Sequence, residues 1–157
     1  MDGLRNPVVL AVHDAQAAGT PILTLDLARE LTRRGKSPVF LLLRGGPMIA
    51  EFRALGPVFL IAEGWEPRQL LAGIAPEVPV IVNSAVATEL AQRGAETGHP
   101  SLLLIHEMRD YIVAQGLMPG LCAARDAGAQ PGVSFPRTAE ALQSELGVLP
   151  VLHRGSC

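Results

Sequence analysis

The chain has 157 residues, of which 48% are hydrophobic and only 4% aromatic, and its formal net charge is −2. This length suits one domain with a sizeable core, which must be mainly aliphatic, as in buried parallel sheets. The sequence has no basic run and no row of aromatic residues, so a nucleic-acid partner is not expected. No apolar segment approaches the ~20 residues of a membrane-spanning helix, and Met1–Pro7 lacks the pattern of a signal peptide.

The N-terminal part has the pattern of a strand, a loop and a helix. The apolar run Val8–Val12 predicts the strand, and the helical spacing of apolar residues in Pro21–Arg34 predicts the helix, with Thr20 as its N-cap and Gly35 as its stop. The loop between them closes on Gly19. Because glycine lacks Cβ, Gly19 either makes a tight turn only or lets the helix N-terminus approach an anion or a sugar hydroxyl.

Apolar runs and helical patterns alternate along the rest of the chain. The predicted strands are Val8–Val12, Pro38–Leu43, Val58–Ile61, Val80–Asn83, Leu102–Ile105, Val133–Phe135 and Val151–Leu152. The predicted helices are Pro21–Arg34, Met48–Leu55, Pro67–Ile74, Ser84–Arg93, Leu117–Ala127 and Thr138–Leu146. This alternation predicts an α/β fold, a doubly wound parallel sheet with helices on both faces and the strand order 3-2-1-4-5, later strands lying outward. The segment Glu107–Leu121 is the least regular and is predicted to be a mobile or ligand-facing loop.

Polar residues directly follow several predicted strands. In an open parallel sheet, ligands bind outside the carboxyl ends of the strands, so these residues are candidates for a binding site. They are His13 and Asp14, Arg44 to Gly46, Asn83 and Ser84, His106 and Glu107, and Arg137. Plainer interpretations exist, since Asn83 or Ser84 suits a helix cap and Arg44 suits a solvated loop charge. We expect one crevice at this edge, lined by Gly19, Asn83, His106 and Glu107.

Several common catalytic and cofactor motifs are absent. The first loop has only Gly19 where a dinucleotide site needs G-x-G-x-x-G, and Arg44 stands where the acid after the second strand would be. There is no phosphate-binding G-x-x-x-x-G-K-[ST] loop and no G-x-S-x-G nucleophile elbow. The four histidines show no metal-ligand spacing, so neither a metal nor a bound cofactor is expected.

Short stretches in a fixed order give a family resemblance. They are 9–14 (VLAVHD), 18–20 (AGT), 25–31 (LDLAREL), 34–35 (RG), 45–48 (GGPM), 51–52 (EF), 54–56 (ALG), 80–84 (VIVNS), 105–107 (IHE), 132–136 (GVSFP) and 138–139 (TA). Taken in order, they resemble the N-terminal domain of GT-B glycosyltransferases, specifically the large retaining family-four group. The resemblance covers essentially the whole chain, residues 1–157, as a single Rossmann-like domain.

The resemblance implies roles for individual residues. In this family two Rossmann-like domains face a cleft, and the N-terminal one mainly binds the acceptor. His106 matches the histidine after the fifth strand that reaches the reaction centre, which makes it the catalytic candidate. Gly19 matches the glycine-rich first loop near the donor phosphates, although Ala18 replaces the first of its two usual glycines. The substrate-binding candidates are His13, Ala18, Gly19, Asn83, Glu107 and Arg137.

The resemblance also implies what the chain lacks. The E-x₇-E element and the domain that binds the nucleotide-sugar donor are not in these 157 residues. We therefore expect sugar transfer to a glycan or lipid-linked acceptor only together with that second domain, without a metal, and no activity of this chain alone. The alternative is a non-catalytic Rossmann-like binding or scaffold module.

Expectations about location and association follow from the same interpretation. Cys122 and Cys157 lack metal-type spacing and are interpreted as thiols of a reducing cytosol. We thus expect a cytoplasmic protein, with peripheral contact to the inner face of the membrane in the full-length form. A rim that a partner domain normally covers also predicts self-association of the isolated chain.

Overall fold

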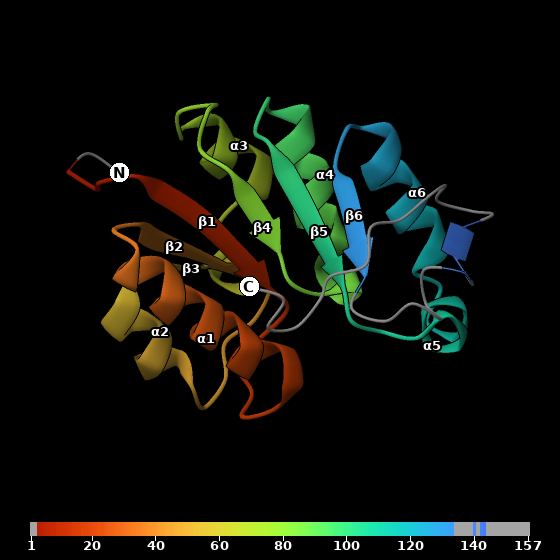
Figure 1. Cartoon of the computed structure of the whole chain (residues 1–157), viewed down its shortest axis with the longest axis horizontal. Coiled ribbons are helices and arrows are strands. Elements are labelled where there is room, and N and C mark those ends of the chain that lie inside the picture. Colours follow the sequence, from red (N-terminus) through yellow and green to blue (C-terminus); the bar gives the residue numbers. More distant parts are fainter. Residues whose placement is uncertain (1–2, 134–139, 141, 144–157) are drawn as a thin grey trace.

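A computed structural model describes residues 3–133, 140 and 142–143. Within these residues, one sheet of six parallel strands has the order β3-β2-β1-β4-β5-β6 (Figure 1). The strands are β1 (Pro7–Val12), β2 (Ser37–Leu42), β3 (Val58–Leu60), β4 (Val80–Val82), β5 (Ser101–Ile105) and β6 (Gln130–Val133). The α/β fold and the predicted strand order are confirmed. The chain order reverses between β1 and β4, which is where such sheets form a crevice.

Helices cover both faces of the sheet. Helices α1 (Gly19–Arg33) and α2 (Ile49–Leu55) pack on the β1–β3 half of one face, and α3 (Pro67–Ala72), α4 (Thr88–Glu96) and α6 (Met118–Asp126) lie on the other (Figure 1). Two short 3₁₀ helices, η1 (Ile61–Glu63) and η2 (Ala85–Ala87), and the helix α5 (Arg109–Ala114) complete the described elements.

Side chains of the strands contribute to two separate hydrophobic cores, one on each face of the sheet. Along β1, Val9 and Ala11 face the core under α3, α4 and α6, whereas Leu10 and Val12 face the core under α1 and α2. The second core includes an edge-to-face contact between Phe40 and Phe52, whose ring centroids are 5.0 Å apart. The near-continuous apolar sequences of β1 and β2 therefore match strands that are buried on both sides.

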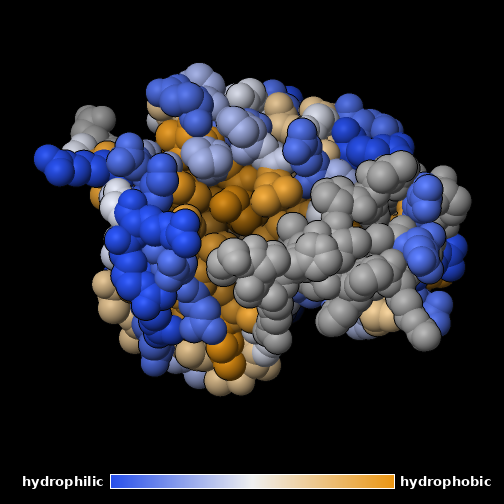
Figure 2. Space-filling model, in the orientation of Figure 1, coloured by the Kyte–Doolittle hydropathy of each residue, from blue (hydrophilic) through white to orange (hydrophobic). Residues whose placement is uncertain are grey.

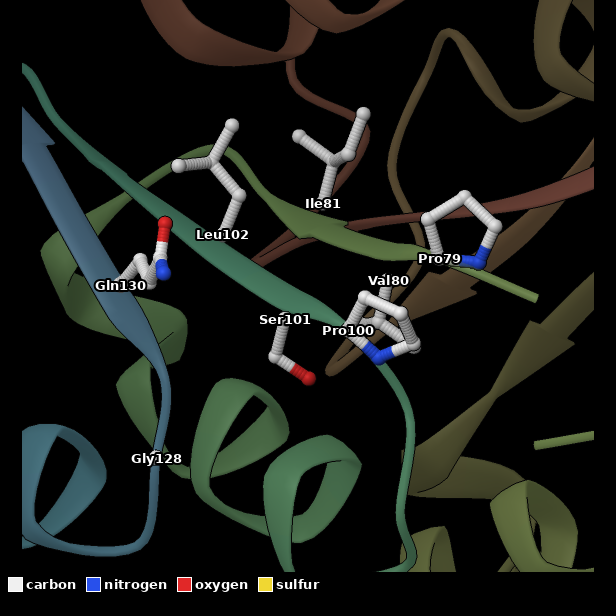
Figure 3. Close-up of a pocket in the computed structure, with 8 residues that line it drawn as sticks. All are labelled: Pro79, Val80, Ile81, Pro100, Ser101, Leu102, Gly128 and Gln130. Carbon is white, nitrogen blue, oxygen red and sulfur yellow. The ribbon is translucent and has the colours of Figure 1, made fainter. Parts of the chain in front are cut away.

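The helices of the described part of the chain cover the β4–β6 half of the α1-side face less completely than the β1–β3 half. Ile81 and Leu102 project to this side, and Leu104 follows on the same face of β5; all three are half-buried. Ile81, Leu102 and Gln130 line a hollow of about 350 Å³ near the amino ends of these strands (Figure 3). Figure 2 shows apolar residues gathered in a hollow near the centre of this face.

Several predicted boundaries were wrong. Helix α1 begins at Gly19 with Ala18 as N-cap, so Thr20 is inside the helix rather than its cap. Strand β6 begins at Gln130, three residues before the predicted Val133, because its backbone pairs with β5 from that point. Glu107–Leu121, predicted as a loop, contains all of α5, whereas the helix predicted at Leu117–Ala127 is confirmed as α6.

Two predicted C-terminal elements fall largely outside the described residues. Of the helix predicted over Thr138–Leu146, residues 140 and 142–143 are described and are helical. Leu142 is buried in the core under α3, α4 and α6. The strand predicted at Val151–Leu152 lies outside the described residues.

Candidate functional site

The site is built where β1, β4 and β5 end. Asn83 directly follows β4, His106 directly follows β5, and His13 directly follows β1. Because these strands are parallel, their carboxyl ends meet at one edge of the sheet. The backbone nitrogen of Asn83 donates a 2.8 Å hydrogen bond to the Ala11 oxygen, so the end of β4 lies next to the end of β1, from which the loop to α1 starts.

A buried row of hydrogen-bonded side chains links α1 to the ends of β4 and β5. Asn83 is 2% exposed, and its Nδ2 donates a 3.0 Å hydrogen bond to Oγ1 of Thr24, which is fully buried on α1. Its Oδ1 is hydrogen-bonded to Nε2 of His106. The Thr24 hydroxyl in turn donates to the carbonyl oxygen of Thr20 over 2.7 Å. The structure thus brings Asn83 and His106 together and adds Thr24 to them.

Glu107 is held at the same edge of the sheet by the start of η2. Both of its carboxylate oxygens lie 3.0 Å from the backbone nitrogen of Ala85, which donates to them at the start of η2. Burial raises the pKa of Glu107 above its usual value, and hydrogen bonds from Ala85, His106, its own backbone and Ser84 oppose that rise. A buried carboxyl group with a perturbed pKa at the carboxyl end of a parallel sheet is typical of functional sites.

His13 and Asp14 form a second polar pair at the same edge. Nε2 of His13 lies 3.5 Å from Oδ1 of Asp14, and the same oxygen accepts a hydrogen bond from the backbone of Gln16 over 3.1 Å. Nδ1 of His13 is buried and has no hydrogen-bond partner among the described residues. A buried nitrogen of this kind costs stability unless something donates to it or accepts from it.

The loop before α1 leaves the helix start without a side-chain cap. Ala18 is the N-cap residue in an extended conformation and makes no side-chain hydrogen bond to the helix. Gly19 has a φ of +24°, and a Cβ built on it would meet nothing within 4 Å. Its neighbourhood is therefore open, and the first N–H groups of α1 are not bonded to the N-cap side chain.

The loop after β2 holds this first loop in place. A Cβ on Gly46 would lie 2.6 Å from the carbonyl carbon of Ala15, so no larger residue fits without movement. Met48 also donates a 2.8 Å backbone hydrogen bond to the Ala15 oxygen. Of the predicted segment Arg44 to Gly46, Gly46 thus has a clear structural role in shaping the edge.

Other sequence candidates have different outcomes. Ser84 caps η2, since its Oγ accepts from the backbone nitrogen of Val86 over 3.0 Å. His99, which was not a candidate, is buried with its ring nitrogens 2.8 and 2.7 Å from the carbonyl oxygens of Val78 and Leu71. Arg137 lies outside the described residues. Across 3–133, 140 and 142–143, no group of three or more His, Cys, Asp or Glu side chains is placed to hold a metal ion.

Thr24 is the site residue that sequence reasoning missed. It lies among the core positions of α1, next to Leu25 and one turn before Ala28, both fully buried. A hydroxyl on the apolar stripe of a helix was the available signal, because such a group needs a buried partner. That its partner is Asn83, 59 residues later, depends on the crossover and is not visible in local sequence.

Comparison with known proteins gives no assignment. No family model matches the chain, and neither a curated protein nor a solved structure matches it. Within the part of the chain that the structure describes, no helix has both the length and the apolar character needed to cross a membrane. A functional interpretation therefore depends on the residues and their geometry.

Proposed function

We propose that this chain is the acceptor-side domain of a GT-B-type glycosyltransferase. A second domain would bind the nucleotide-sugar, and this domain would place a glycan or lipid-linked acceptor. The observation that carries the proposal is the polar edge at the switch between β1 and β4, where His106 is hydrogen-bonded to Asn83 and the Glu107 carboxylate accepts from the backbone of Ala85. The family resemblance of the strand-end stretches supports the same interpretation.

The proposed chemistry uses groups that this edge supplies. Sugar transfer needs an acceptor hydroxyl held in a fixed position and stabilisation of the charge that develops on the leaving diphosphate. His106 would contact the acceptor hydroxyl. The start of α1, with Gly19 and no side-chain cap, would contribute N–H groups toward phosphate oxygens when the second domain brings the donor.

The test measures whether the chain binds soluble oligosaccharides and common nucleotide-sugars. Nuclear magnetic resonance (NMR) and calorimetry detect the binding. We expect an oligosaccharide to shift the signals of His106 and Glu107. His106→Ala should weaken that binding about tenfold, the loss expected for one hydrogen bond. Lys36→Ala, an exposed change just before β2 and so at the opposite edge of the sheet, should leave binding unchanged.

Binding of nucleotide-sugars is the result that could contradict the proposal. On the proposal they bind this chain weakly, because the second domain supplies most of their site. Micromolar binding of a nucleotide-sugar by these 157 residues would mean that the edge is a complete donor site. The proposed division of labour would then be wrong.

A second candidate is a non-catalytic binding module. The observation in its favour is that Thr24, Asn83 and His106 are hydrogen-bonded to one another. Saturation of this kind is typical of a structural polar network. Oligosaccharide binding that is insensitive to His106→Ala, with no transfer after a donor domain is joined to the chain, would favour this candidate.

A further inference from the structure

We infer that Thr24 and Asn83 are positioning residues that hold the His106 ring with its proton on Nε2. In the neutral ring, Nδ1 is then the nitrogen that accepts a hydrogen bond or a proton. The use of that nitrogen toward an acceptor hydroxyl rests on the proposed function. The orientation itself rests only on the hydrogen bonds among the three side chains and one backbone carbonyl.

The direction of every hydrogen bond follows from the Thr20 carbonyl. A carbonyl oxygen only accepts, so the Thr24 hydroxyl donates its one hydrogen to the Thr20 oxygen, 2.7 Å away. Oγ1 of Thr24 must then accept from Asn83, which requires the Nδ2 amide group to face it, at 3.0 Å. Oδ1 of Asn83 is left facing Nε2 of His106, and because Oδ1 only accepts, Nε2 carries a hydrogen.

Burial makes this order hard to reverse. Thr24 is fully buried and Asn83 is 2% exposed, so water is a poor substitute partner for either. A flipped Asn83 amide would face Nε2 with its NH₂ group and turn Oδ1 toward Thr24. The Thr24 hydroxyl would then either donate to Oδ1 and lose its bond to the Thr20 oxygen, or keep that bond and leave Oδ1 without a donor. In both cases a buried polar group loses its hydrogen bond, which costs stability.

These hydrogen bonds also connect the start of α1 with the ends of β4 and β5. Thr24 lies on α1 five residues after Gly19, whereas Asn83 and His106 end β4 and β5. The hydroxyl therefore connects the helix that begins at Gly19 with the imidazole. Because Nε2 donates to Asn83, the neutral His106 ring has its lone pair on Nδ1 as long as these hydrogen bonds are intact.

The test reads the protonated nitrogen directly. Two-bond proton–nitrogen NMR spectra of the ¹⁵N-labelled chain distinguish the two neutral forms of each histidine ring, and His106→Gln identifies the His106 signals. At a pH where the ring is neutral, we expect His106 to show the Nε2–H form alone. Thr24→Val should cause loss of that single form, with a mixed pattern, because the Asn83 amide is no longer held.

Two variants control for the change of side chain. Thr24→Ser keeps the hydroxyl and should restore the single Nε2–H form. Thr32→Val removes a comparable hydroxyl on the same helix, which donates to the Ala28 oxygen over 2.8 Å but does not reach Asn83. It should leave the His106 signals unchanged.

The outcomes separate this inference from the proposed function. A wild-type His106 in the Nδ1–H form, or a Thr24→Val spectrum equal to wild type, would overturn the positioning role. The wild-type spectrum decides the first point even if Thr24→Val does not fold. Failure to bind oligosaccharides with the Nε2–H form intact would count against the proposed function only.

Discussion

At the scale of single residues, Glu107 has the clearest consequence for pH dependence. Its pKa is raised in the folded chain, chiefly because the carboxylate is buried. The folded protein therefore keeps a proton that the unfolded chain, with a carboxyl pKa near 4.5, has already lost. The contribution of Glu107 to stability is present at low pH and is lost as the pH rises through the unfolded and then the folded pKa.

Replacing Glu107 with Gln removes this loss. The stability of Glu107→Gln relative to wild type should increase as the pH rises from about 4 to about 7, because the neutral amide pays no charge-burial cost. Urea unfolding at several pH values measures the difference. As a control, hydrogen bonds from Arg34 and Arg33 lower the pKa of the half-exposed Glu30 below 4.5 in the folded chain. The stability of Glu30→Gln relative to wild type should therefore fall as the pH rises toward 4.5 and stay level from there to about 7. A pH-independent difference for Glu107→Gln would contradict the assignment.

The polar residues at the strand ends show how far local sequence reaches. The expectation that polar groups follow β4 and β5 could be made from the apolar runs alone, and the structure places Asn83 and His106 in contact there. The choice between cap and site could not be made locally. Ser84 is a cap, whereas the neighbouring Asn83 turns into the core toward Thr24, because the crossover brings α1 over the end of β4.

At the scale of elements, existence was predicted better than boundaries. Strands β1 and β2 and helix α1 follow from strong periodicity, but the start of α1 depends on the conformation of Ala18 rather than on a capping side chain. Strand β6 begins with Gln130, Pro131 and Gly132, which locally resemble a turn. Only pairing with β5 makes this segment a strand, and such pairing is not a local property.

The two adjacent glycines after β2 test how the loops are held together. Gly46→Ala should destabilise the chain by about 1–3 kcal/mol, because its Cβ would overlap the Ala15 carbonyl and force the loop before α1 to move. Gly45→Ala is the matched control. Its Cβ would make an ordinary 3.6 Å contact with Leu60, so little change is expected. Urea unfolding of both variants measures the difference, and equal stability losses would show that the loops are not in the close contact described.

At the scale of the whole molecule, the helices of residues 3–133 cover the two faces of the sheet unequally. Parallel sheets are normally buried on both faces. Here α3, α4 and α6 pack against one face of the β4–β6 half, while Ile81 and Leu102 on the other face are half-buried. The apolar hollow in Figure 2 is the visible result of that difference.

Neighbouring leucines on β5 make this asymmetry measurable. Leu103 is 1% exposed in the core under α4 and α6, and Leu103→Ala should cost about 2–5 kcal/mol of stability, as for other buried leucines. Leu102 projects to the opposite, half-buried face, so Leu102→Ala removes fewer packed contacts and should cost less than half as much. The two variants lose the same atoms from adjacent positions of one strand, so strand propensity cancels between them. Urea unfolding at two protein concentrations measures both. Equal losses at low concentration would mean that the Leu102 face is buried within the chain itself, and losses that become equal only at high concentration would mean that a second copy covers it.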